Sequence, residues 1–140
     1  MSKNRSYSGS CLCQKVRFEI RAGIEGIVYC HCSQCRKVQG SAFAVNGTVA
    51  AEHFRFLCGE EELTAYQSTT KRIKYFCRRC GSPILSKNTE FPDKVRVRLG
   101  TIETDIMERP CAHIYTDSKA NWEDIEGELP QYAEKLPQHR

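Results

Sequence analysis

The sequence predicts a single domain built mainly from antiparallel β-strands. Its 140 residues suit one hydrophobic core, and apolar residues make up 40% of the chain, as is usual for globular proteins. Short segments of alternating apolar and polar residues recur between turn-forming positions, whereas helical periodicity is scarce. We expect the domain to span residues 5–130, with residues 131–140 as a C-terminal tail.

The strands can be justified in chain order from their alternation. In segment 16–20, Val16, Phe18 and Ile20 share one face, which is typical of a half-buried strand. Segment 94–99 repeats the pattern, and we expect its basic residues to point outward. Strand-forming residues between turn signals also predict strands over 26–29, 43–49, 53–57, 63–67 and 71–76.

One helical turn and a tethered C-terminal tail complete the expected structure. Residues 33–38 follow a predicted strand and have room for a single turn of helix. The tail from Leu129 contains Pro130 and Pro137, and its propensities do not favour a regular element. We expect Trp122 to tether this tail to the domain.

Charge and hydropathy argue against two classes of partner. The formal net charge of +4, from 21 basic and 17 acidic residues, is too small to indicate nucleic acid, although it suits small anionic ligands. No stretch approaches the ~18 apolar residues of a membrane span, and the polar N-terminus does not resemble a secretory signal. We therefore expect a cytoplasmic protein that binds neither nucleic acid nor membrane.

Nine cysteines carry the strongest chemical signal in the chain. In a reducing compartment, clustered cysteines more often bind metal or react than form disulfides. An odd number also excludes complete pairing. Seven of them lie at metal-ligand spacings, as Cys11-x-Cys13, Cys30-x-Cys32-x-x-Cys35 and Cys77-x-x-Cys80.

Two of these clusters are complementary halves of a structural zinc site. In Cys77-x-x-Cys80 a tight turn brings two sulfurs to one ion, and Gly81 can adopt the positive φ that such a turn needs. Cys11 and Cys13 project to one face at the end of a strand and can supply the other two ligands. A Cys₄ zinc would thus fasten the first strand to the second half of the domain.

The third cluster predicts a catalytic zinc. Cys30, Cys32 and Cys35 offer three thiolates, and three protein ligands leave a coordination position for a substrate thiolate. Zinc with three thiolates carries a net negative charge, so the adjacent Arg36 and Lys37 could stabilise it or hold substrate carboxylates. Two zinc ions per chain are expected.

Several alternatives stay open at this point. The cysteines could be free core thiols or hold an iron–sulfur cluster, although their pairing fits zinc better. His31, between two ligands, should project away from the metal and lie beside the site or at the surface. The basic residues at 71–72, 78–79, 96 and 98 suit solvated faces. A fourth protein ligand could close the second site, with His31, His53, His113, Cys58 and Cys111 as the candidate donors.

The order of the motifs is specific. It runs Gly9-Ser-Cys11-Leu-Cys13, then Cys30-His-Cys32-Ser-Gln-Cys35-Arg36-Lys37 with Gly40-Ser41, then Phe76-Cys77-Arg-Arg-Cys80-Gly81-Ser82. Gly59, Tyr66-Gln-Ser68 and His113-Ile-Tyr with Trp122 extend it. This pattern resembles the glutathione-dependent formaldehyde-activating enzyme family, which includes the domain of centromere protein V.

The resemblance implies a β-tent fold in residues 5–130 and the same division of the cysteines between two zinc ions. It also implies condensation of formaldehyde with glutathione to S-(hydroxymethyl)glutathione, which makes the protein a carbon–sulfur lyase with a small thiol as its partner. His31 or a zinc-bound water could move the proton, and Arg36, Lys37 or Arg79 could bind the glutathione carboxylates. A zinc-stabilised binding module without turnover is the alternative.

Overall fold

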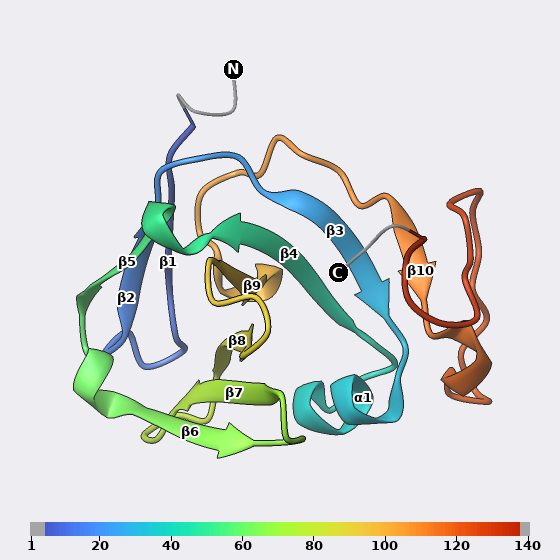
Figure 1. Ribbon diagram of the computed structural model, residues 1–140, viewed down its shortest axis with the longest axis horizontal. Coiled ribbons are helices and arrows are strands. Elements are labelled where there is room, and N and C mark those ends of the chain that lie inside the picture. The colour runs from blue at the N-terminus through green and yellow to red at the C-terminus, as the bar shows by residue number, and fades with distance from the viewer. Residues whose placement is uncertain (1–4, 138–140) are drawn as a thin grey trace.

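The computed structural model describes residues 5–137, which form two β-sheets, one short α-helix and four 3₁₀-helical turns (Figure 1). The smaller sheet has the order β1-β2-β5, with β1 Tyr7–Ser10, β2 Arg17–Ile20 and β5 Phe54–Cys58. The larger sheet has the order β10-β3-β4-β9-β8-β7-β6. Its strands are β3 Glu25–Cys30, β4 Ala44–Ala50, β6 Leu63–Gln67, β7 Arg72–Cys77, β8 Pro83–Asn88, β9 Lys94–Arg98 and β10 Ala112–Ile114.

The predicted mainly-β class is confirmed. The strand pairs are antiparallel except for β10, which pairs with β3 in parallel, and the arrangement is compatible with a β-tent. The sequence implied a strand that ends at Cys11 and Cys13 without giving its bounds, and it did not indicate β8 or β10. The structure ends β1 at Ser10 and places Cys13 in the turn that follows. β1 contains Gly9, β8 begins with Pro83, and β10 has only three residues. Such segments become strands through pairing with distant partners and not through their own propensity.

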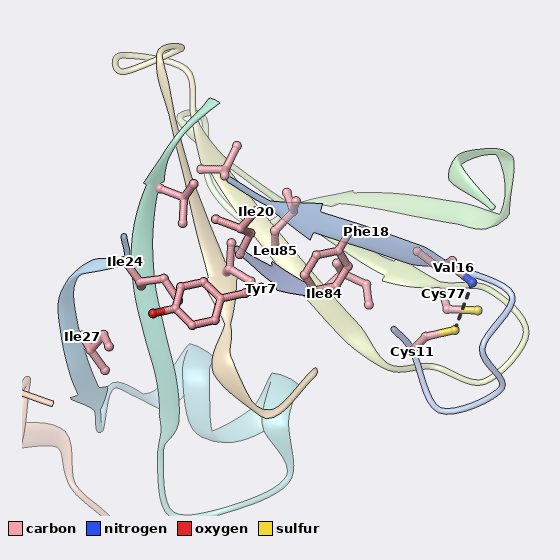
Figure 2. Packing of buried hydrophobic residues seen from close by; sticks show 13 residues of the cluster. Tyr7, Cys11, Val16, Phe18, Ile20, Ile24, Ile27, Cys77, Ile84 and Leu85 are labelled. Atoms are coloured by element: carbon pink, nitrogen blue, oxygen red, sulfur yellow. Dashed lines mark hydrogen bonds between the residues drawn. The ribbon is translucent and has the colours of Figure 1, made fainter. Parts of the chain in front are cut away.

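The main core lies between the two sheets. Phe18 and Ile20 from β2 are fully buried and belong to one cluster with Val95 and Val97 from β9. Figure 2 shows Phe18 beside Ile84 of β8, with Cys11 and Cys77 at one end of the cluster. Because side chains alternate along a strand, this packing directs the remaining residues of β9 to the opposite face of the larger sheet.

Helix α1, Ser33–Gln39, follows β3 and extends the predicted turn by one residue. Its N-cap is Cys32, whose Sγ accepts a hydrogen bond from the Cys35 N–H at 3.3 Å. Its C-cap is Gly40 with φ +69°. Cysteine sulfur therefore caps the helix and positions two members of the second cluster. Between residues 5 and 137, no helix is long and apolar enough to cross a membrane.

Residues 130–137 run along β10, and the last three residues of the predicted tail lie outside the described residues. Tyr132 and Leu136 pack against the second apolar cluster, and the Tyr132 N–H donates to the His113 carbonyl at 2.9 Å. Trp122 is 69% exposed, so the prediction that it tethers the tail is wrong. Backbone pairing with β10 and the burial of Tyr132 hold the segment instead.

Candidate metal centres

The first candidate centre unites four cysteines from the two halves of the chain. The sulfurs of Cys11, Cys13, Cys77 and Cys80 all lie within 4.8 Å of one another. The Cys11–Cys13 and Cys13–Cys77 sulfur distances are 3.6 and 3.8 Å. A tetrahedral ion with metal–sulfur bonds of about 2.3 Å separates its ligands by about 3.8 Å. The cluster therefore has the size of a Cys₄ metal site.

Local backbone geometry directs these sulfurs inward. The Val16 N–H donates to Cys11 Sγ and the Arg79 N–H donates to Cys77 Sγ, each at 3.4 Å. Gly81, with φ +81°, donates to the Cys77 carbonyl at 2.8 Å and closes the turn. Figure 2 shows Cys11 and Cys77 side by side, with the bond from Val16 drawn. Such amide donors stabilise thiolates over thiols.

The second candidate centre contains three cysteines, Cys30, Cys32 and Cys35, with sulfurs within 4.8 Å of one another. Cys30 ends β3, and the other two occupy the N-cap and first turn of α1. The side-chain amide of Asn46 on β4 lies 4.0 Å from Cys35 Sγ. A strand-to-helix transition thus gathers three sulfur donors within six residues.

None of the proposed fourth donors joins this centre within the described chain. His31 is fully buried, and its Nε2 lies 2.9 Å from His113 Nδ1, so the two histidines pair with each other. Cys58 is exposed, with Sγ 3.6 Å from the Lys15 carbonyl. Of the other candidates, Cys111 is exposed and His53 lies beside Glu52.

The thiols of each cluster influence one another's ionisation. Hydrogen bonds with Cys30 and Cys32 hold the pKa of Cys35 far below its usual range, whereas hydrogen bonds with Cys32 and Cys35 raise the pKa of Cys30. Without a cation, ionisation of Cys35 therefore opposes ionisation of Cys30. Full ionisation of the cluster requires a bound cation, and soft sulfur donors suit zinc.

A pocket of about 560 Å³ opens beside the second cluster. All three of its cysteines line the pocket, together with residues from β4, β7, β8, β9 and the segment after β10. Glu90 is the one carboxylate among the described residues that line it. Six basic residues also line the pocket: Lys71, Arg72, Lys74, Arg96, Arg98 and Lys135. The site therefore combines sulfur donors with a surplus of positive charge.

The cations of this pocket differ from those that the sequence suggested. Arg96 and Arg98 lie on the face of β9 that points away from the core, but this face lines the pocket, and Arg98 is only 4% exposed. The expectation that these basic side chains point outward into solvent is therefore wrong. Neither Arg36 nor Lys37 lines the pocket. Arg79 donates instead to the Glu62 carboxylate at 2.9 Å. Alternation in 94–99 correctly separates two faces, but it does not reveal that both faces are covered.

The chain is similar to known proteins in sequence and in fold. A family model described as glutathione-dependent formaldehyde-activating enzyme matches residues 6–118. A Halomonas elongata protein, named provisionally as such an enzyme, is 30% identical over 129 residues, covering 84% of this chain and 80% of its own. A crystal structure of a Rhodobacter sphaeroides protein superposes with a TM-score of 0.61 at 26% identity, covering 89% of this chain and 98% of its own. The chain belongs to the glutathione-dependent formaldehyde-activating enzyme family.

Proposed function

We propose that this protein is a zinc-dependent carbon–sulfur lyase that forms or cleaves S-(hydroxymethyl)glutathione at the Cys30–Cys32–Cys35 cluster. One observation carries the proposal: three sulfur donors line a pocket, and no fourth protein donor joins them in the described chain. Catalytic zinc commonly has three protein ligands and one exchangeable position, whereas structural zinc is closed by four. The Cys11–Cys13–Cys77–Cys80 cluster would then hold the structural zinc.

The reaction needs a reactive thiolate and the transfer of the thiol proton to another atom. Zinc held by the three cysteines would bind glutathione sulfur as a thiolate and lower its pKa. In synthesis, a C–S bond forms between that sulfur and the carbonyl carbon of formaldehyde, and the thiol proton ends on the new hydroxyl oxygen. Cleavage reverses both changes, so no oxidant or reductant is needed.

Residues of the pocket would orient the substrate and bind its charged groups. Basic side chains of the pocket attract the anionic tripeptide. Tyr115 also lines the pocket, and burial together with the nearby Cys30 raises its pKa, so its hydroxyl stays protonated and can donate a hydrogen bond. His31 does not line the pocket, which argues against it as the group that contacts substrate.

The decisive measurement is the rate at which formaldehyde and glutathione exchange with their adduct. Two-dimensional NMR exchange spectroscopy with ¹³C-formaldehyde measures this rate at equilibrium, where the uncatalysed reaction gives the baseline. Zinc-loaded protein should raise the exchange rate without changing the adduct concentration at equilibrium.

Two controls make the result specific. Cys32→Ser should return exchange to the baseline, because one of three ligands is lost. Cys58→Ser removes an exposed cysteine outside both clusters and should retain full acceleration. Exchange at the baseline with fully zinc-loaded wild-type protein would instead favour a zinc-stabilised binding module without turnover.

A further inference from the structure

Arg98 is a buried cation with unused hydrogen-bonding capacity. It lines the pocket, is 4% exposed, and its Nη1 has no hydrogen-bond partner. In the register of β4 and β9 it lies opposite Asn46, whose amide approaches Cys35 Sγ at 4.0 Å. The guanidinium therefore sits in the row of residues next to the sulfur cluster. A buried donor without a partner is costly, and an anionic ligand could supply the missing acceptor.

Lys74 approaches the same cluster from β7. It lies opposite Ser86 of β8, and Ser86 lies opposite Arg96 of β9, so a polar row crosses the sheet on the pocket side. Lys74 forms no salt bridge with any carboxylate of residues 5–137. Burial lowers its pKa, and the nearby Cys35 opposes that shift.

The charges of the pocket do not balance without a ligand. The Glu90 carboxylate already pairs with Lys71 at 2.8 Å. A divalent metal held by three thiolates would contribute a single negative charge, whereas Lys74 and Arg98 together bring two positive charges to the pocket. Like charges on neighbouring strands destabilise a sheet, and buried charges are costly unless they are paired. The pocket is therefore built to receive an additional anion.

We propose that Lys74 and Arg98 form an anion subsite beside the Cys30–Cys32–Cys35 cluster, and that this subsite selects thiols that carry a carboxylate. This inference rests on the proposed function and assigns the residues that would recognise the carboxylate of its thiol substrate. Guanidinium presents paired N–H donors that match the two oxygens of a carboxylate. Glutathione satisfies the requirement, whereas a neutral thiol of similar size does not.

A matched pair of thiols tests this selectivity. N-acetylcysteine and N-acetylcysteinamide both offer a thiol but differ in the carboxylate. Calorimetry with zinc-loaded protein should show that the acid binds at least about tenfold more tightly, as expected for one charge-assisted hydrogen-bonded pair. Equal affinities for the acid and the amide would overturn the anion subsite.

Variants distinguish carboxylate binding from general support of the metal centre. Arg98→Met should abolish the preference for the acid while leaving the affinity for the amide within about twofold, and Arg98→Lys should restore part of the preference. Arg21→Met is the matched control, because Arg21 is exposed and lies outside the pocket. If Arg98→Met weakens both thiols equally, the residue supports the centre and does not select the substrate. Lys74→Met gives the same test if Arg98→Met fails to fold.

A third ligand separates this proposal from the proposed function. S-methylglutathione keeps both carboxylates but cannot become a thiolate. If no thiol releases a proton on binding, the proposed coordination of the thiol is wrong. In that case, weak binding of S-methylglutathione that is lost in Arg98→Met would still support the anion subsite. If S-methylglutathione binding is absent or insensitive to Arg98→Met, and the thiols bind without preference, the subsite is wrong even where thiol coordination holds.

Discussion

The Nε2 atom of His31 lies 2.9 Å from the Nδ1 atom of His113, and this hydrogen bond joins the end of β3 to β10. Both rings are buried, and His113 also stacks on Tyr29 with ring centroids 4.8 Å apart. Burial and the neighbouring His113 lower the pKa of His31 to about 4. The pair is therefore neutral at pH 7, with one ring donating and the other accepting.

Replacing His113 should expose the dependence of His31 on its partner. His113→Phe retains an aromatic ring for Tyr29 but leaves His31 without a hydrogen bond, because its Nδ1 is already unpartnered. We expect a loss of about 1–3 kcal/mol in the free energy of unfolding, measured with urea. His53→Phe, at a half-exposed histidine, should change stability by less than about 0.5 kcal/mol. Equal effects of the two substitutions would contradict this role.

Gly59 should tolerate no side chain. Its φ is +83°, and a Cβ there would lie 1.9 Å from the Lys15 carbonyl oxygen. Gly26 also has a positive φ, +55°, but a Cβ there would meet nothing within 4 Å. Gly26→Ala should therefore cost about 1 kcal/mol in backbone strain, and Gly59→Ala at least about 2 kcal/mol more, in thermal or urea unfolding. Comparable losses would show that the steric contact relaxes easily.

Glu108 gives a pH dependence whose sign can be derived. Burial raises its pKa, but bonds from the Tyr7 hydroxyl and the Ile24 N–H and the charge of Arg5 outweigh it, so the pKa lies below 4.5. A lowered carboxyl pKa contributes stability that is fully present above about pH 4.5 and is lost as the pH falls further. Wild type should exceed Glu108→Gln in stability at pH 7, and the difference should shrink below about pH 4.5. Urea titrations from pH 7 to 3.5 measure it; a difference that stays constant would contradict the assignment.

Metal content should follow the division of the seven clustered cysteines. Freshly purified protein should contain about two zinc ions per chain, because one tetrahedral ion accepts four thiolates. Cys32→Ser should retain about one ion, and Cys111→Ser, outside both clusters, about two. Elemental analysis that finds one zinc in the wild type, or bound iron, would overturn the two-site assignment.

The two centres should differ in their contribution to folding. Cys77→Ser removes a ligand from the cluster that joins β7 to the segment after β1, and a structural zinc contributes on the order of 10 kcal/mol. It should unfold or aggregate the protein, whereas Cys32→Ser should melt cooperatively at a modestly lower temperature. Thermal melts in which Cys32→Ser is the more damaging change would reverse the structural and catalytic roles.

The sequence could indicate the cysteine clusters because their geometry is largely local. Cys77 and Cys80 meet across one tight turn, and Cys30, Cys32 and Cys35 lie at one strand-to-helix junction. Spacing within a turn or along a strand determines which sulfurs converge. Alternation in segments such as 16–20 likewise identified strands with one buried face.

Tertiary structure alone decided which charges surround the second cluster. Lys74 and Arg98 belong to strands that β8 separates within the sheet, and each reaches the pocket only through long-range pairing. The same holds for His31 and His113, which meet because β10 pairs in parallel with β3. Alternation assigns a side chain to one of two faces, but the packing of distant segments determines whether that face meets solvent or forms a binding pocket.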